Sequence, residues 1–348
     1  MRNSVIVVAA LTLSASAFAQ HANPMVDLLA KKQPLFGLYA PANPRGGRGG
    51  GRGGPAGAPG TTGTQSVAAA PAPATPPTPP KTPAELAKDA LGFAPADYIF
   101  DGSMECGRGP TNECFDRSYA TFGEFVKGYV AASKPAERLK HPLVVKVHMV
   151  APDPVLAAAN IGRQLNLGVS TVVLVGVESP SEVKTALAAM RFKSQGGTRP
   201  DDVGGAPAFW GMSEKQYKDK ADVWPLNPKG ELLNWTIVES KEGLAHVREI
   251  AAVPGIAVLF PGAGTLRGVF TTTAPDGTRT FDAEGWEKAI QQVLDACNEF
   301  KVPCGFPANT PDVMEQRYKQ GFRVFVIGWG DNGFKTVEAG LKLSGRQP

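Results

Sequence analysis

Eight apolar runs of strand length recur along this chain, and runs of helix length separate them. The strand-like runs cover residues 34–40, 97–102, 143–149, 171–177, 232–238, 255–260, 302–308 and 323–329. The helix-like runs cover 84–92, 122–132, 154–168, 179–191, 243–253, 283–301, 310–321 and 334–345. The strand-like runs are almost continuously apolar, which is typical of a parallel sheet covered by helices. Eight such units without a dinucleotide-binding fingerprint predict an α/β fold, specifically a (β/α)8 TIM barrel.

Local sequence signals mark where several of these helices begin. Thr82-Pro83 and Asp153-Pro154 each place a capping residue before a first-turn proline. Ser179 is predicted to cap the next helix, with Pro180 at its first position and Glu182 at its third. The stretch 192–230 is rich in Pro and Gly and shows no regular period.

The N-terminal quarter of the chain differs from the rest. Residues 1–19 have an early Arg, a short apolar run and small residues at the end, which predicts a cleaved signal peptide and an exported, periplasmic protein. Barrel sequence starts at 20–42, is interrupted by a Gly/Pro/Ala-rich insert at 43–82 that we expect to be disordered, and resumes over 83–348. No later run reaches about 18 apolar residues, so no membrane span is expected in the mature chain.

Charge argues against a nucleic-acid-binding function. The formal net charge of the chain is +4, but the excess of basic residues lies in the N-terminal quarter, and residues 83–348 carry a small net negative charge. The Arg-Gly sequences of the insert would suit RNA, but an exported protein with an acidic barrel does not. Export also permits disulfides, so the spacing favours Cys106–Cys114 and Cys297–Cys304 about as much as it favours free thiols.

In a barrel of this kind the active site lies at the C-terminal ends of the strands. The polar residues expected there are Asp101, Glu105, Cys106, Lys146, His148, Glu239, Thr265, Arg267, Asn309, Asp331 and Asn332. Acidic oxygens that converge on one place suit a hard divalent cation, Mg²⁺ or Mn²⁺.

Several of these residues also have an ordinary structural interpretation. His148 would serve as a hydrogen-bonded structural residue, Asp331 as a cap for residues 334–335, and Arg267 as a surface residue. Glu239 is different, because Ser240 suits the capping role for the following helix and leaves the carboxylate in need of a partner.

The segment WTIVESKEGLAHVREIAAVPGIAVLFPGAGTL (235–266) resembles the core of the HpcH/HpaI aldolase/citrate lyase family. NPMVDLLAKKQPLFGLYA (23–40), MRFKSQGGTRP (190–200), ADVWPLNPKGELL (221–233) and GFRVFVIGWGDNGFKTV (321–337) fit the same pattern. The resemblance implies a (β/α)8 barrel of the phosphoenolpyruvate/pyruvate-binding type that forms a homo-oligomer.

The resemblance also implies a chemistry. In the family a Glu and an Asp hold a divalent metal that stabilises a pyruvate enolate, an Arg supports the oxyanion and a His moves protons. Glu239 stands at the metal Glu, but Thr265 occupies the Asp position in GAGTL and Lys146 replaces the Arg. The His position falls in DGSMEC, where Met104 or Cys106 stands.

Two functions from different classes follow. The first is a metal-dependent carbon–carbon lyase acting on a 2-oxo or hydroxy-oxo acid. It uses Lys146, His148 and Asp101 in catalysis, Arg267, Thr265 and Gly264 in substrate binding, and Glu239 and Glu105 on the metal. The second is an exported barrel without aldolase activity that binds a small carboxylate or serves as an interaction module.

Overall fold

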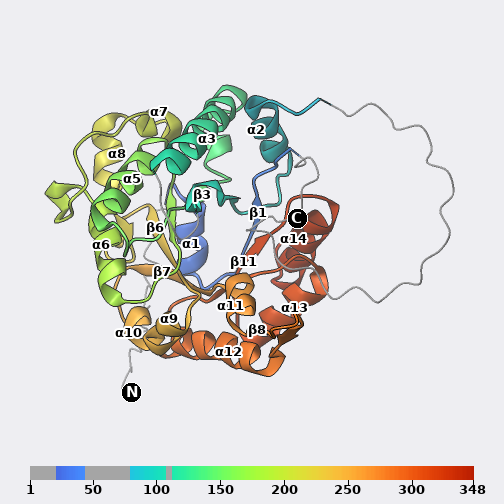
Figure 1. The fold of residues 1–348 in the computed structure, drawn as a ribbon. Helices are drawn as coiled ribbons and strands as arrows, with labels where there is room; N and C mark the ends of the chain where they lie inside the picture. Colours follow the sequence, from blue (N-terminus) through green and yellow to red (C-terminus); the bar gives the residue numbers. More distant parts are fainter. Residues whose placement is uncertain (1–20, 44–78, 107–111) are drawn as a thin grey trace, which may run out of the picture.

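The computed structural model describes residues 21–43, 79–106 and 112–348, and a parallel sheet ringed by helices organises them (Figure 1). The strands of this sheet are β1 (Leu35–Tyr39), β2 (Ile99–Asp101), β3 (Leu143–Lys146), β4 (Thr171–Leu174), β5 (Val223–Trp224), β6 (Leu232–Val238), β7 (Ile256–Pro261), β10 (Gly305–Pro307) and β11 (Val324–Ile327). All eight strands predicted from the sequence are present, and the α/β fold with a parallel sheet is confirmed.

The strands are joined in the order β10-β11-β1-β2-β3-β4-β6, and β6 also pairs with β7 and with the short β5. Every pairing in this sheet is parallel. A parallel bridge links Leu259 of β7 to Cys304, directly before β10, and the Leu259 amide donates to Pro303 O at 3.0 Å. β7, which pairs with β6 at one end of the sheet, therefore contacts the segment directly before β10, the strand at the opposite end.

Helices surround the sheet (Figure 1). They are α1 (Pro24–Ala30), α2 (Pro83–Gly92), η1 (Ser103–Glu105), α3 (Asn112–Ala132), α4 (Pro135–Arg138), α5 (Pro154–Asn166), α6 (Pro180–Met190), η2 (Lys193–Gln195), α7 (Ala206–Trp210), α8 (Glu214–Lys220), α9 (Lys241–Ala245), α10 (Val247–Ala251), α11 (Ala263–Val269), α12 (Ala283–Phe300), α13 (Pro311–Gln320) and α14 (Asp331–Leu343). An antiparallel hairpin, β8 (Thr271–Thr273) and β9 (Arg279–Phe281), follows α11.

Of the three helix caps predicted from the sequence, two form as side-chain caps. Thr82 forms the complete capping box with Glu85, and Asp153 accepts from the Leu156 amide at 2.9 Å, as predicted. Ser179 precedes its helix as expected, but its hydroxyl donates to Glu182 at 3.0 Å and does not cap a backbone amide. The Glu182 carboxylate accepts the Glu178 amide instead, because it reaches back over the first turn.

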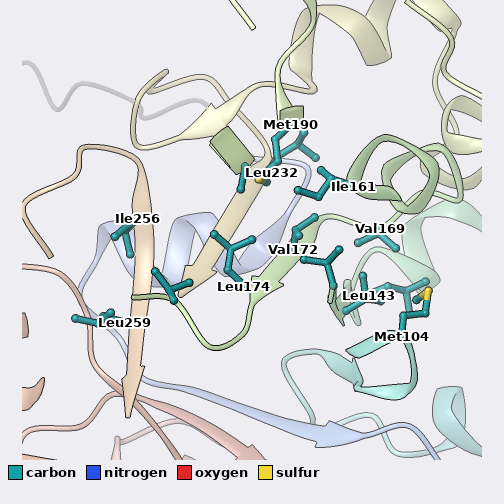
Figure 2. Close-up of a cluster of buried hydrophobic side chains, with 14 of the residues drawn as sticks. Met104, Leu143, Ile161, Val169, Val172, Leu174, Met190, Leu232, Ile256 and Leu259 are labelled. Atoms are coloured by element: carbon teal, nitrogen blue, oxygen red, sulfur yellow. The ribbon is translucent and has the colours of Figure 1, made fainter. Parts of the chain in front are cut away.

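The alternation of side chains along the strands divides the core into two layers. One face of the sheet packs against the surrounding helices, through residues such as Leu143, Val172 and Leu232 (Figure 2). The other face forms a second cluster that includes Val144 and Trp235. Because both faces are covered by apolar side chains, the strands lack the polar alternation of a half-exposed sheet.

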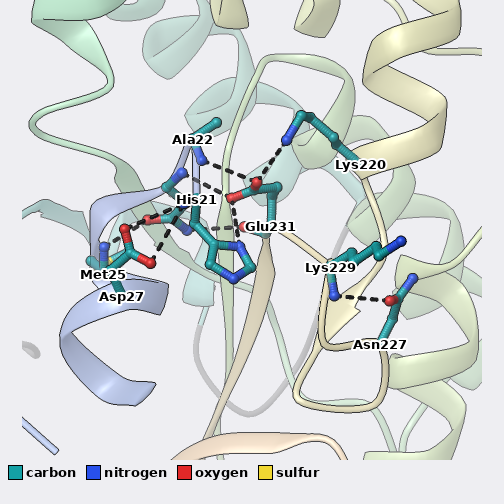
Figure 3. Close-up of polar contacts among 9 residues, drawn as sticks. His21, Ala22, Met25, Asp27, Lys220, Asn227, Lys229 and Glu231 are labelled. Carbon is teal, nitrogen blue, oxygen red and sulfur yellow. Dashed lines mark hydrogen bonds and ion pairs between the residues drawn. The ribbon is translucent and has the colours of Figure 1, made fainter. Parts of the chain in front are cut away.

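Helix α1, which the sequence analysis did not assign, fills part of the second cluster. Its buried residues Met25, Val26 and Leu29 pack with Leu35 at the start of β1. Buried Glu231, directly before β6, accepts the amides of Ala22 and Asn23 and the Lys220 ammonium (Figure 3). Glu231 thus holds the segment that enters α1 at the N-terminal end of the strands.

Covalent and polar links fix other segments. Disulfides join Cys106 to Cys114 and Cys297 to Cys304. The predicted signal peptide and most of the insert lie outside the described residues. At the ends of the insert the Asn43 side chain exchanges two hydrogen bonds of 2.7 Å with the Lys81 backbone. Within the described ranges no helix has the length and apolar character needed to cross a membrane.

Candidate functional site

Charged side chains lie together at the carboxyl ends of the strands. Every second side chain of a strand points to the inner face of the sheet, and this pattern continues to the end of the strand. On β3, Val144 belongs to the inner cluster and Lys146 follows it by two positions. On β6, Trp235 and Ile237 face the same cluster and Glu239 comes two residues later. Successive side chains of a strand point to opposite faces, so Lys146 and Glu239 continue the inward face where the strands end. We call this end the mouth.

Lys146 forms the central ion pair of the mouth. Its Nζ lies 2.7 Å from Glu105 Oε2, and the side chains are 14% and 29% exposed. Burial acts to lower the pKa of Lys146, but the charges of Glu105, Tyr39 and Glu239 and the hydrogen bond to Glu105 outweigh it and raise the pKa. Lys146 is therefore protonated and positively charged at neutral pH.

Tyr39, the last residue of β1, also belongs to this group. A Cβ added to Gly102 would lie 3.6 Å from Lys146 Cδ and 3.8 Å from Tyr39 Cε1, so both side chains pack over the same glycine. Burial raises the pKa of the Tyr39 phenol, the nearby Lys146 charge lowers it in part, and the charges of Glu105 and Asp101 add to the rise. The sequence analysis missed Tyr39, although its place at the end of a core strand marked it.

Glu239 stands on the β6 side of the mouth. Burial raises the pKa of its carboxyl, against a hydrogen bond with the Thr265 side chain, the charge of Lys146 and a bond from the Gly176 amide. A Cβ on Gly262 would lie 2.5 Å from Glu239 Oε2, so only glycine fits against this carboxylate. Glu239 therefore has partners in the structure: it forms hydrogen bonds with the Thr265 side chain and the Gly176 backbone, and it interacts electrostatically with Lys146.

Asp101 ends β2 and has a local role. Its Oδ1 accepts the Ser103 amide at 2.8 Å and also the Ser103 hydroxyl. Burial raises the pKa of the Asp101 carboxyl against these two hydrogen bonds. Asp101 therefore shapes the turn into η1, which carries Glu105.

Two predicted site residues, His148 and Arg267, have partners outside the Lys146 group, and a third, Gly264, faces open space. His148 is fully buried, its Nδ1 lies 3.0 Å from Met149 O, and its Nε2 lies 3.0 Å from the Asn160 side chain of α5. The Arg267 guanidinium stacks 3.9 Å from the centre of the Phe281 ring. Gly264 is exposed and has open space around it. These contacts of His148 and Arg267 involve residues other than Lys146, Glu105 and Glu239.

Two further candidates are also accounted for. Cys106 is in a disulfide, so it is neither a base nor a ligand. The Asn309 side chain accepts the Gly328 amide at 3.3 Å.

The residues of the mouth do not fit the divalent metal that the resemblance implied. Among the described residues no group of three or more His, Cys, Asp or Glu side chains is arranged to hold a metal ion. Of the two carboxylates near Lys146, Glu105 is already bound to its ammonium, and Glu239 has a raised pKa and a hydroxyl, not a second carboxylate, beside it. The family pattern offers the dication two neighbouring carboxylates, whereas here one carboxylate is already paired with an ammonium and the other has only a neutral hydroxyl beside it.

Comparison with known proteins links the chain to the aldolase/citrate lyase family. Residues 131–333 match the family model of the HpcH/HpaI aldolase/citrate lyase family. A 2-dehydro-3,6-dideoxy-6-sulfogluconate aldolase of Pseudomonas putida is 26% identical over 209 residues, 58% of this chain and 72% of the relative.

Solved structures agree on the fold. A HpcH/HpaI family protein from Burkholderia cenocepacia has a TM-score of 0.56 at 19% identity, covering 88% of this chain and 92% of its own. Macrophomate synthase has a TM-score of 0.53 at 16% identity, covering 92% and 86%. Because the family model covers more than half of the 348 residues, the chain belongs to the HpcH/HpaI aldolase/citrate lyase family.

Proposed function

We propose that this protein is a carbon–carbon lyase of the aldolase type that acts on a 2-oxo or hydroxy-oxo acid through a pyruvate enolate. The observation that carries the proposal is the partly buried cation Lys146 at the mouth, which pairs with Glu105 and interacts electrostatically with Glu239, in a chain of the aldolase/citrate lyase family. The Pseudomonas putida relative is named for a 2-dehydro acid, which supports a 2-oxo acid as the substrate class.

The side chains divide the work by charge. The Lys146 ammonium attracts the substrate carboxylate and stabilises negative charge on the keto oxygen as the enolate forms. Glu105 holds that ammonium in place. Glu239, with a carboxyl pKa above its ordinary value, is suited to hold and return a proton at the mouth. The Tyr39 hydroxyl offers a further neutral donor on the β1 side.

A second candidate is supported by the same residues. Thr265 stands where the family pattern has an Asp, and the candidate histidine His148 has both ring nitrogens engaged within the protein. A mouth with a cation but altered proton-transfer groups would bind a small carboxylate without turning it over. This is the non-aldolase alternative drawn from the sequence.

Three broader features belong to this proposal. We infer that the parallel sheet, with its bridge between Leu259 and Cys304, is the complete (β/α)8 barrel. We infer export to the periplasm, which the two disulfides support because such bonds persist in oxidising compartments. A homo-oligomer is the assembly that the family resemblance favours.

Pyruvate release from a panel of 4-hydroxy-2-oxo acids tests the proposal. The wild-type mature protein should release pyruvate, and Glu239→Gln should lower the rate by about 10²-fold, the size expected for a positioned acid–base group. The matched control is Glu242→Gln, an exposed carboxylate in the following helix, which should leave the rate unchanged. An absence of pyruvate release across the panel, with the carboxylates still bound, would favour the second candidate.

A further inference from the structure

We propose that the Lys146 ammonium replaces the divalent cation of the family, so that the mouth binds a 2-oxo carboxylate and stabilises its oxyanion without a metal ion. The inference rests on the proposed function for the identity of the site and its substrate class. It goes beyond that function by naming the charge that does the binding.

The position of the ammonium is the first support. Lys146 Nζ contacts Glu105 Oε2 at 2.7 Å and interacts electrostatically with Glu239. A dication held by the same two carboxylates would compete with this ammonium for them. Like charges in a partly buried site repel strongly, so the carboxylates favour one cation over two.

The charge of the group is the second support. Glu105 and Glu239 carry at most two negative charges, and Lys146 supplies one positive charge. A dication added to this set would leave an excess of positive charge. At the position beside Glu239, Thr265 contributes a neutral hydroxyl in place of the carboxylate of the family pattern, so this side of the mouth offers a dication one negative charge fewer.

The rigid support of both partners is the third observation. Buried Gln164 of α5 donates to the Lys146 carbonyl at 2.8 Å, which fixes the backbone at the end of β3. Cys106, next to Glu105, is bonded to Cys114 of α3, which fixes the turn that carries the carboxylate. A charge held in advance by its surroundings stabilises an oxyanion without reorganisation.

Calorimetric titration with oxalate, a stable mimic of the pyruvate enolate, tests the inference. Wild type should bind oxalate equally well in EDTA and in Mn²⁺. Lys146→Met should weaken binding by about 10- to 100-fold, the range for loss of a charged hydrogen bond. Lys146→Arg should restore most of the affinity, and the exposed Lys215→Met control should bind as wild type does. Circular dichroism and melting curves confirm that each variant is folded.

Two further measurements extend the test. Wild type should show no tight Mn²⁺ binding by electron paramagnetic resonance, whereas Thr265→Asp, which adds the missing carboxylate beside Glu239, should gain it. Borohydride added with pyruvate should leave the protein mass unchanged, because the ammonium acts as a charge and forms no imine.

The outcomes separate this inference from the proposed function. Oxalate binding that requires Mn²⁺ would overturn the inference and leave the proposed function standing. Metal-free binding that survives in Lys146→Met, or a borohydride-reduced adduct on Lys146, would also overturn it. Failure to bind oxalate or pyruvate under any of these conditions would refute both. Metal-free binding that Lys146→Met loses and Lys146→Arg keeps is the result that supports it.

Discussion

Replacing Glu231 by Gln should loosen the N-terminal end of the fold, because this carboxylate is the anchor of α1. Glu231 is 1% exposed and accepts the Ala22 amide at 3.0 Å, the Asn23 amide at 2.9 Å and Lys220 Nζ at 3.1 Å (Figure 3). Glutamine keeps the shape but turns an NH₂ group toward donors that need an acceptor. One backbone amide then stays buried without a partner.

The magnitude follows from these contacts. A hydrogen bond to a charged group contributes about 1.5–3 kcal/mol, and a buried donor left without an acceptor costs about 1–3 kcal/mol. The Lys220 side chain is 42% exposed, so its ion pair adds at most about 1 kcal/mol. We expect Glu231→Gln to lower the free energy of unfolding by about 3 kcal/mol.

Urea unfolding at neutral pH measures this loss, and native-state hydrogen exchange locates it. The α1 amides should exchange faster in the variant than in wild type. The control is Glu214→Gln, an exposed carboxylate paired with Lys218, which should stay within about 0.5 kcal/mol of wild type. A Glu231→Gln loss below about 1 kcal/mol, with α1 exchange unchanged, would refute the anchoring role.

Three other predictions test different parts of the structure. Gly262→Ala should cost about 1–3 kcal/mol of unfolding free energy in urea and disturb Glu239, because its Cβ would lie 2.5 Å from Glu239 Oε2. Gly264→Ala meets open space within helix α11 and should cost no stability, and an equal loss in both variants would contradict the packing argument. Burial opposes ionisation of Asp222, but hydrogen bonds from Arg191, Asn227 and Val223 outweigh it and lower the pKa of this carboxyl. The ionised Asp222 carboxylate therefore stabilises the fold above its ordinary pKa near 3.8, and this stabilisation is lost as the pH falls below that value. The unfolding free energies of wild type and Asp222→Asn should differ by about 2 kcal/mol at pH 7 and converge in acid. A difference that does not change with pH would contradict this. Replacing Cys106 and Cys114 together by Ser should lower the free energy of unfolding by about 2 kcal/mol and weaken oxalate binding. Replacing Cys297 and Cys304 should lower the stability alone, and identical oxalate affinities in both double variants would show that the first disulfide does not position Glu105.

The sequence predicted the alternation of strands and helices well because the strands are buried on both faces. An apolar run such as LLNWTIV needs no knowledge of its partners to be recognised as a core strand. Capping at Thr82 and Asp153 was equally local. Helix α1 was missed because it is only seven residues long. Its apolar side chains pack in the second cluster, on the inner face of the sheet, and not in the layer between the sheet and the surrounding helices.

The candidate site was predicted in part. The rule that strand ends meet at one edge identified Lys146, Glu105 and Glu239, which the structure brings into one electrostatic group. It did not reveal that Glu105 binds Lys146, since this pairing depends on the turn of η1 after β2. For His148 the strand pattern suggested the mouth, but β3 ends at Lys146 and the ring turns toward Asn160 of α5. The direction of a side chain beyond the last strand residue depends on tertiary contacts, which the local sequence pattern does not predict.

Exchange of the pyruvate methyl protons in D₂O, followed by proton NMR, tests the central claim most directly, because it detects enolate formation without knowledge of the aldehyde partner. Wild type should accelerate the exchange over buffer in the presence of EDTA, and Lys146→Met should lower the accelerated rate by about 10²-fold, the size expected when an oxyanion-stabilising group is removed. An exchange rate with wild type equal to that in buffer, or one that Lys146→Met leaves unchanged, would contradict an enolate-stabilising mouth centred on Lys146.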